Sequence, residues 1–156
     1  MIVRHIYVAK NHNFYGHHGK EPGNYPMTEL KEAECEAGTG IVGDRFHNYK
    51  TDYKGQITFF SWEVYKDMCT SFDLENVPPS VFRRNIIVSG VDLNEFIEKK
   101  FTLQGIQFFG TQEAAPCYWM NGVVGPGAED AMKGRGGLRA KILTSGTLCT
   151  NTNPIR

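Results

Sequence analysis

Thr111-Gln-Glu-Ala-Ala-Pro-Cys-Tyr-Trp-Met-Asn121 is the stretch around which the rest of the chain is arranged. Pro116 is typical of the first turn of a helix, where its missing N–H needs no partner. The sequence therefore predicts a glycine-interrupted helix over residues 117–132, with Cys117 one residue inside its N-terminus. There the positive end of the helix dipole would favour a thiolate. Cys117 is then either a nucleophile or soft-metal ligand, or a small buried side chain packed beside Trp119.

The composition is that of one folded domain without a strong charge. A chain of 156 residues buries about 70% of its unfolded surface, and we expect a single domain over residues 1–156. Seventeen basic residues cancel seventeen acidic ones, which argues against a general grip on nucleic acid or an anionic membrane. Nothing indicates an oligomeric state.

Neither a signal peptide nor a membrane-spanning run is visible in the sequence. The four cysteines contain no Cys-x-x-Cys pair, so we expect reduced thiols and no zinc ribbon. Together these features predict a cytoplasmic protein.

Short strands alternate with turns along most of the chain. Strands are expected at residues 2–9, 30–37, 56–60, 86–90 and 138–144, a hairpin at 101–103 and 106–109, and an edge strand at 147–150. Helical segments are expected at 62–70, with Ser61 as N-cap, and at 128–132. This pattern predicts a mainly β fold, a β-barrel or strongly coiled mixed sheet with two or three short helices.

A long polar loop is predicted over residues 10–26. It contains His12, His17 and His18. The three imidazoles could bind a metal, although their spacing matches no zinc pattern, and the simpler interpretation is solvated loop histidines.

Three further segments carry candidate binding residues. Asp44 could orient a ligand, cap the chain or pair with Arg45, or it could make only local turn hydrogen bonds. The run Arg83-Arg84-Asn85 at the start of a strand could grip a phosphate or other oxyanion through its planar guanidiniums, or one arginine could belong to a structural ion pair.

The third segment is Lys133-Gly-Arg-Gly-Gly-Leu-Arg-Ala-Lys141. Its glycines, Gly136 and Gly137 among them, could let backbone N–H groups converge on an anion, with Arg135 and Arg139 supplying charge. The alternative is a glycine turn that leads into the next strand. Neither the Rossmann nor the P-loop spacing is present.

Several of these pieces also occur in a fixed order: Gly43-Asp-Arg-Phe46, Arg83-Arg-Asn-Ile86, Gly90-Val-Asp-Leu93, Phe108-Phe-Gly110, Pro116-Cys117 and Gly136-Gly-Leu-Arg-Ala-Lys-Ile-Leu143. The ordered set resembles the MOSC domain, named for the C-terminal domain of molybdenum cofactor sulfurases, over residues 30–148. The chain looks like a small stand-alone member. The resemblance implies a barrel-like β fold and cytoplasmic residence.

The resemblance gives Cys117 a role. It matches the family's cysteine, which is thought to carry sulfane sulfur or to bind the molybdenum of a pterin cofactor. The resemblance also implies cofactor-binding residues, which we place at Arg83, Arg84, Asn85, Asp44, Arg135, Gly136, Gly137 and Arg139. The family's larger reductases enclose the cofactor with an added N-terminal region, and loop 10–26 stands in its place here.

Three hypotheses remain open. Cys117 could accept sulfane sulfur from a separate cysteine desulfurase and pass it to a molybdenum-cofactor enzyme. It could instead ligate molybdenum in a reductase of N-hydroxylated compounds, as in some relatives. The chain could also be a non-catalytic module for a phosphorylated small molecule. Pyridoxal phosphate belongs to the desulfurase, and we expect none to be bound by this chain.

Overall fold

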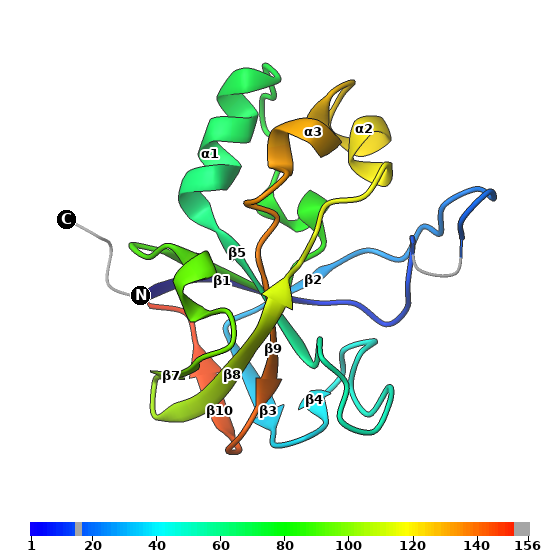
Figure 1. The fold of residues 1–156 in the computed structure, drawn as a ribbon. Helices are drawn as coiled ribbons and strands as arrows, with labels where there is room; N and C mark the ends of the chain where they lie inside the picture. The colour runs from blue at the N-terminus through cyan, green and yellow to red at the C-terminus, as the bar shows by residue number, and fades with distance from the viewer. Residues whose placement is uncertain (15–16, 152–156) are drawn as a thin grey trace.

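The structure is a computed structural model that describes residues 1–14 and 17–151. Its strands are β1 Ile2–Val8, β2 Thr28–Leu30, β3 Glu32–Glu36, β4 Gly40–Ile41, β5 Ile57–Ser61, β6 Ile86–Ser89, β7 Lys100–Leu103, β8 Ile106–Glu113, β9 Leu138–Ile142 and β10 Gly146–Cys149. Its helices are α1 Trp62–Ser71, α2 Trp119–Val123 and α3 Ala128–Met132, with 3-10 turns η1 Pro79–Phe82 and η2 Leu93–Phe96. The protein is mainly β, as predicted (Figure 1).

The main sheet is mixed and has seven strands in the order β2-β1-β6-β5-β9-β8-β7. Strands β5 and β6 are parallel, with Phe59 opposite Ile86, because α1 and η1 lie between them in the chain. The other pairs in this sheet are antiparallel. Among the described residues β2 and β7 remain its edges, so no closed barrel forms and the barrel prediction is not confirmed.

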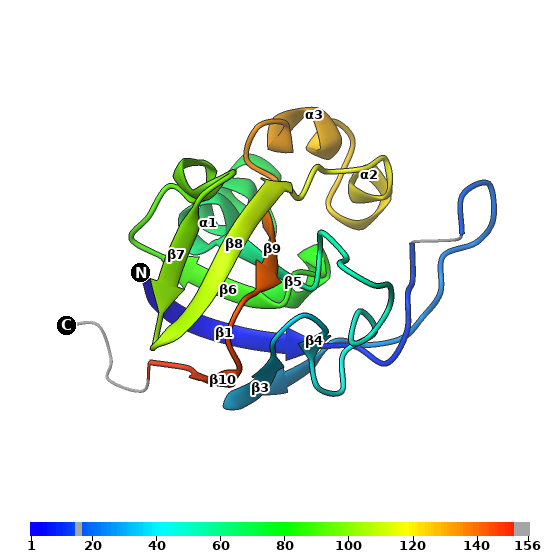
Figure 2. The same cartoon turned by 60° about the horizontal axis from the view of Figure 1, so that its bottom comes forward.

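A smaller sheet of three strands, in the order β10-β3-β4, packs against the main one. Figure 2 shows β3 and β10 below β1, with β4 near the end of β1. The strand predicted at residues 30–37 is therefore two strands, because β2 pairs with β1 whereas β3 pairs with β10 and β4. The predicted edge strand at 147–150 is confirmed by β10.

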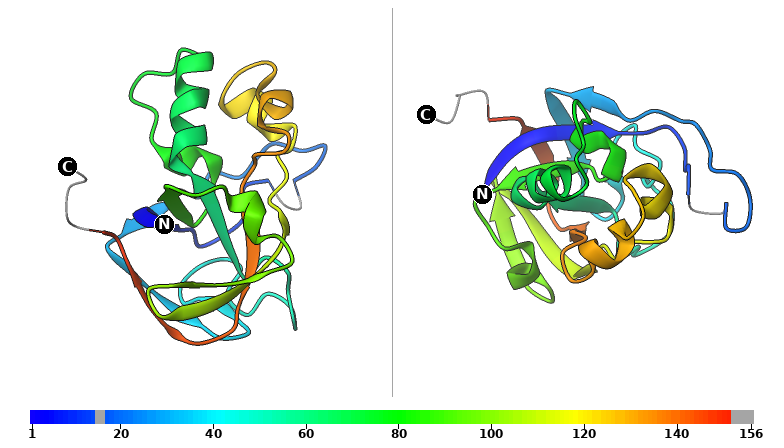
Figure 3. Two further views of the ribbon diagram at one scale, coloured as in Figure 1. Left: turned by 60° about the vertical axis from the view of Figure 1, so that its left-hand side comes forward. Right: turned by 90° about the horizontal axis from the view of Figure 1, so that it is seen from above.

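Alternation along the central strands creates two cores. Phe59 and Ile86 face the smaller sheet and lie in the core that both sheets share. Phe60 and Ile87 face the opposite way, into a core formed with the helices. Because successive strand residues point to opposite faces, one pair of strands supports both cores. Figure 3 shows the helices gathered over one side of the sheet.

The helix predicted at residues 62–70 is confirmed by α1, with the Ser61 side chain accepting a hydrogen bond from the Val64 N–H. The glycine-interrupted helix predicted over residues 117–132 is not one helix but two five-residue helices, α2 and α3. Gly125 and Gly127 between them have φ of 158° and 88°, which a right-handed helix does not allow. The helical segment predicted at residues 128–132 is confirmed by α3. No helix in the described part of the chain is long and apolar enough to cross a membrane.

Candidate functional site

Cys117 lies in the irregular segment that joins β8 to α2. Tyr118 is the N-cap of α2, so Cys117 precedes the helix, and its carbonyl accepts a hydrogen bond from the Met120 N–H at 3.0 Å. The predicted position inside a helix N-terminus is therefore wrong. A five-residue helix is also too short to supply the dipole on which that prediction relied. Any activation of the sulfur must come from side chains.

Those side chains surround a cavity of about 360 Å³ that Cys117 helps to line. Four arginines line it as well: Arg45, Arg83, Arg84 and Arg139. The cysteine and the arginine run predicted from the sequence thus meet in one cavity, although Arg83 and Arg84 lie just before β6 and Cys117 lies just after β8, far apart in the chain.

Arg84 joins the segments around the cavity. Its Nε donates to the Gly136 carbonyl at 3.1 Å, Nη1 to the Phe82 carbonyl at 3.0 Å and Nη2 to the Ala114 carbonyl at 2.9 Å. Ala114 directly follows β8 and leads to Cys117. The guanidinium therefore fixes the backbone that carries the sulfur, with carbonyls rather than carboxylates as partners.

Arg83 is 8% exposed and is held in the same way. Its Nη1 donates to the Tyr25 carbonyl at 2.8 Å and its Nη2 to the Asn11 carbonyl at 3.1 Å. Both carbonyls belong to the long loop predicted at residues 10–26, whose described part contains neither helix nor strand. Arg83 thus anchors this loop beside the cavity.

The pKa values of the cavity arginines depend on burial and on one another. Burial lowers the pKa of Arg83 to about 10, the positive charge of Arg45 adds to this, and Asp44 opposes it. Burial likewise lowers the pKa of Arg84 to about 10, again with a contribution from Arg45, whereas the charge of Cys117 opposes it. Both guanidiniums remain protonated at neutral pH. Arg84 and Cys117 both line the cavity, so the guanidinium charge lies in the same space as the sulfur.

Asp44 makes a salt bridge, one local hydrogen bond and one hydrogen bond to a distant part of the chain. Its Oδ1 lies 3.1 Å from Nη1 of Arg45, and the side chains are 0% and 7% exposed, respectively. The carboxylate also accepts from the Ala9 N–H and the Phe46 N–H. Asp44 therefore neutralises Arg45 and does not itself line the cavity.

Asn85 is fully buried beneath the cavity and binds strands together. Its Oδ1 accepts from the N–H and the hydroxyl of Thr58, and its Nδ2 donates to the Tyr7 carbonyl. These contacts link β6 with β5 and β1. Of this pair it is Thr58, not Asn85, that lines the cavity.

The two arginines of the glycine-rich segment 133–141 lie at different cavities. Arg139 lines the cavity and donates to the Tyr53 hydroxyl at 2.8 Å. Arg135 does not line it: its Nη1 lies 2.6 Å from Oδ2 of Asp67, and it borders a second, smaller cavity of about 220 Å³.

Gly136 and Gly137 serve packing rather than an anion concavity. A Cβ on Gly136 would lie 2.3 Å from the Ala114 carbonyl oxygen, and one on Gly137 would lie 2.3 Å from that of Phe59. The Gly136 N–H is also taken by Oε2 of Glu113 at 3.1 Å. Glycine is needed here because two backbone segments approach closely.

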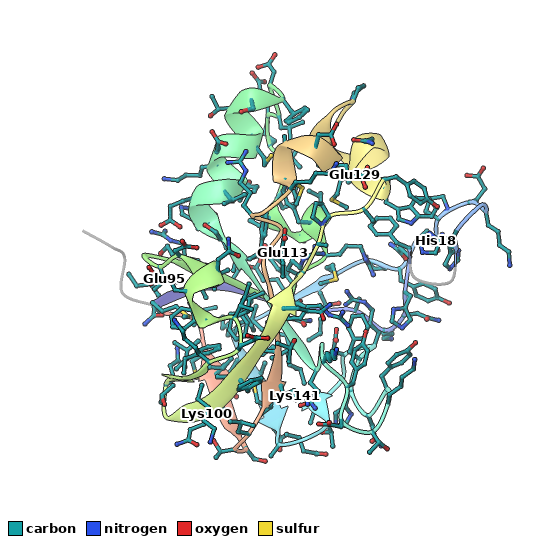
Figure 4. The ribbon with its side chains drawn as sticks, in the orientation of Figure 1. His18, Glu95, Lys100, Glu113, Glu129 and Lys141 are labelled. Atoms are coloured by element: carbon teal, nitrogen blue, oxygen red, sulfur yellow. The ribbon has the colours of Figure 1, made fainter. Side chains whose placement is uncertain are left out.

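Glu113 is a site residue that the sequence reasoning missed. It ends β8, four positions before Cys117, and it lines the cavity as the only carboxylate in the described part of that lining. Figure 4 shows it near the tip of β8, below α3. Glu113 lies within residues 111–121, so its nearness to Cys117 in the sequence could have drawn attention to it. Only the fold shows that its side chain lines the cavity.

Aromatic rings form two walls of the cavity. Phe14 and Trp119 stack with centroids 5.3 Å apart, and Phe46 and Tyr53 stack at 5.6 Å. The Trp119 indole Nε1 is buried and has no hydrogen-bond partner in the described residues. Phe46 directly follows Arg45 and could have been noticed with the Asp44–Arg45 pair.

Two of the three loop histidines reach the site. His12 and His18 line the cavity, whereas Nδ1 of His17 lies 2.9 Å from the Glu21 carbonyl oxygen. His18 is visible beside α2 in Figure 4. Burial lowers the pKa of His12, and Arg45 adds to this, so the imidazole is neutral at pH 7. No group of three His, Cys, Asp or Glu residues among the described ones could hold a metal ion, so the loop does not form a metal site there.

Known structures share this fold. The YuaD protein from Bacillus subtilis is similar with a TM-score of 0.74 and 16% identity, over 95% of this chain and 90% of that one. YiiM from Escherichia coli is similar with a TM-score of 0.63 and 16% identity, over 94% of this chain and 66% of that one. At these identities the likeness concerns the fold alone. No curated protein matches the sequence.

The sequence itself matches the MOSC domain over residues 17–152. This range contains Cys117 and the four arginines of the cavity, and it leaves out only β1 and part of the long loop among the described segments. The chain therefore belongs to the MOSC domain family.

Proposed function

We propose that the protein carries sulfane sulfur on Cys117. The observation that supports this most directly is the shared cavity: Cys117 lies with three guanidiniums, those of Arg83, Arg84 and Arg139, which have hydrogen-bond partners but no carboxylate at ion-pair distance in the described chain. A persulfide is anionic at neutral pH, and cationic neighbours that are already fixed in place stabilise such a charge.

The residues around Cys117 divide the work. Arg84 holds the backbone on which the sulfur is carried and places a positive charge close to it. The stacked pair Phe14 and Trp119 forms an apolar wall of the cavity. Sulfur would arrive from a separate cysteine desulfurase and leave to a molybdenum-cofactor enzyme. The four cysteines are free, and we place the protein in the cytoplasm.

A second candidate is favoured by the aromatic walls. Phe14 with Trp119, and Phe46 with Tyr53, offer flat surfaces that suit a pterin ring. The donor set fits a molybdenum cofactor as well: Cys117 is a soft ligand for the metal, and the guanidiniums of Arg83 and Arg139 suit a phosphate. Bound molybdenum would supply two-electron redox chemistry. In that case the protein would be a reductase, with N-hydroxylated compounds as the expected substrates.

Intact-mass measurement tests the first candidate. The protein is incubated with a cysteine desulfurase and cysteine, and we expect a gain of one sulfur atom that is absent in Cys117→Ser. Cys149→Ser is the matched control, because Cys149 is exposed and lies outside the cavity, and it should still gain the sulfur. Persistence of the gain in Cys117→Ser would contradict the proposal.

Metal analysis distinguishes the second candidate, a molybdenum-dependent reductase, from the other two. Protein made in a host that synthesises the cofactor should contain molybdenum only if Cys117 is intact. If neither sulfur nor molybdenum depends on Cys117, but a phosphorylated ligand binds and loses affinity in Arg84→Ala, the protein is a non-catalytic binding module instead.

A further inference from the structure

The cavity contains more positive charge than its own residues neutralise. Arg45 is paired with Asp44, but Arg83 and Arg84 donate only to carbonyls and Arg139 to the Tyr53 hydroxyl. In the described lining these three guanidiniums face one carboxylate, that of Glu113, which is itself held by a backbone N–H.

Such an arrangement is costly without a ligand. Arg83 is 8% exposed, and a buried charge is tolerated when an opposite charge is close. Each guanidinium has five N–H donors. Arg83 uses two of its donors in the hydrogen bonds described above, and Arg84 uses three. Donors and charge therefore remain for an oxyanion that enters the cavity.

The sulfur lies in this same cavity. Cys117 and Arg84 both line the cavity, which has a volume of about 360 Å³. A molecule of a few heavy atoms can enter it whole. A protein donor would need to insert its own persulfide on a protruding loop. The geometry suits a small donor whose anionic group binds the guanidiniums while its sulfane sulfur meets Cys117.

We infer that the protein takes sulfur directly from small sulfonate-type sulfane donors, of which thiosulfate is the simplest, with Arg83, Arg84 and Arg139 binding the sulfonate oxygens. This inference rests on the proposed function of Cys117 as a sulfur carrier. It adds a donor class and a sulfurtransferase activity that does not require a desulfurase.

The transfer balances without an added oxidant or reductant. The Cys117 thiolate attacks the outer sulfur of thiosulfate, and a bond forms between Sγ and that sulfur. The bond from that sulfur to the sulfonate sulfur breaks, and its electron pair leaves with sulfite, a dianion. Cys117 becomes a persulfide anion. A nucleophile such as cyanide then takes the terminal sulfur as thiocyanate and restores the thiolate.

The guanidiniums favour this step because charge moves towards them. Three negative charges enter the step, one on Sγ and two on thiosulfate, and they leave it as one on the persulfide and two on sulfite. The thiosulfate charge that lay partly on its outer sulfur moves onto the sulfite group, so donors placed at the sulfonate stabilise the leaving group. Loss of one such charge-assisted hydrogen bond should slow loading about tenfold.

The test compares two sulfur sources on the same protein. Purified protein is incubated with thiosulfate or with a desulfurase and cysteine, and sulfur on Cys117 is measured by peptide mass spectrometry and by thiocyanate release with cyanide. We expect loading from thiosulfate that disappears in Cys117→Ser. Arg139→Gln should lower the ratio of the thiosulfate loading rate to the desulfurase loading rate about tenfold, because the sulfonate loses a donor that only the small substrate uses.

Arg135→Gln is the matched control, because Arg135 lies outside this cavity and pairs with Asp67. It should load normally from both sources. As a measurement that needs no variant, sulfate should compete with thiosulfate on the wild-type protein and not with the desulfurase. Loading from the desulfurase alone overturns the inference and leaves the proposed function intact. Loading from neither source overturns the inference and the proposed function together. Loading from thiosulfate at a rate that neither Arg139→Gln nor added sulfate lowers also overturns the inference.

Discussion

The four cysteines have different surroundings, although the sequence presents them alike. Cys35 is fully buried in β3, Cys149 is exposed on β10, and Cys117 is partly exposed in the cavity. Cys69, next to the buried Met68 on α1, is only partly buried. Reactivity of a thiol follows access and nearby charge, which separates Cys117 from the others.

Cys35 should make the protein sensitive to alkali. Burial raises the pKa of this thiol from its ordinary value of 9.0 to about 12, with a hydrogen bond to the Leu148 backbone opposing. Because the folded pKa is the higher one, the stabilising contribution is complete below pH 9 and is lost as the pH rises towards 12. By pH 10 the free energy of unfolding should have fallen by about 1 kcal/mol on this account, estimated from the linkage relation. Urea titrations across this range should show a shallower loss for Cys35→Ala, and equal slopes would contradict the assignment.

Arg84→Lys should destabilise the protein although it keeps the charge. A lysine cannot reach the carbonyls of Gly136, Phe82 and Ala114 together, and buried acceptors left without a donor cost about 1–3 kcal/mol. We expect a fall of about 2 kcal/mol in the free energy of unfolding by urea denaturation. Arg135→Lys is the control, because an exposed ion pair contributes less than about 1 kcal/mol. Equal effects of the two variants would mean that Arg84 does not hold the Cys117 segment.

Residue types in the sequence identified Cys117, Arg83, Arg84 and Arg139, but not their partners. The side chain of Arg84 meets Ala114 and Gly136, thirty and fifty-two positions away in the chain. Such contacts are set by strand order, which no local pattern encodes. For the same reason Glu113 was missed, and Arg135 was grouped with residues that it does not meet.

At the scale of single elements, local signals predicted most strands and α1. A polar cap before an apolar helical face located the start of α1, and alternation located β5 and the β7–β8 hairpin. The predicted helix over residues 117–132 failed because Gly125 and Gly127 adopt positive φ. Glycine permits that conformation without requiring it, so the sequence left both outcomes open.

Ser61→Ala should shorten or weaken α1. The Ser61 hydroxyl accepts from the Val64 N–H at 3.2 Å, and removing such a cap costs about 1 kcal/mol. Ser71→Ala at the other end of the same helix is the matched control, because Ser71 is exposed and does not cap the N-terminus. Thermal denaturation followed by circular dichroism should show a lower midpoint for Ser61→Ala only. A similar drop in both variants would contradict the assigned cap.

At the scale of the whole molecule, the fold depends on the order in which the strands pair, and not only on which segments form strands. The sequence predicted a β-rich fold with short helices, and the structure confirms this, but the open order from β2 to β7 could not be read from strand patterns. One stretch, Ile57–Ser61, lies in the middle of the main sheet and sends Phe59 and Phe60 into different cores. The two cores therefore share their central strands, and neither can lose its packing without disturbing the other.

This sharing predicts that the described chain unfolds as one unit, as expected of a single domain. Ile142→Ala in the core between the sheets and Met132→Ala in the helix-side core should each cost about 2–5 kcal/mol. Trp62 and Trp119 both pack against the helix-side core, so fluorescence reports on that side, while the infrared band of β-structure reports on the sheets. In both variants the two signals should change at the same, lowered urea concentration. Leu143→Ala, which alters a side chain 37% exposed next to Ile142, should shift neither signal appreciably. Fluorescence that changed well before the infrared band would mean that the helical layer unfolds alone, and that the strands common to both cores do not couple them.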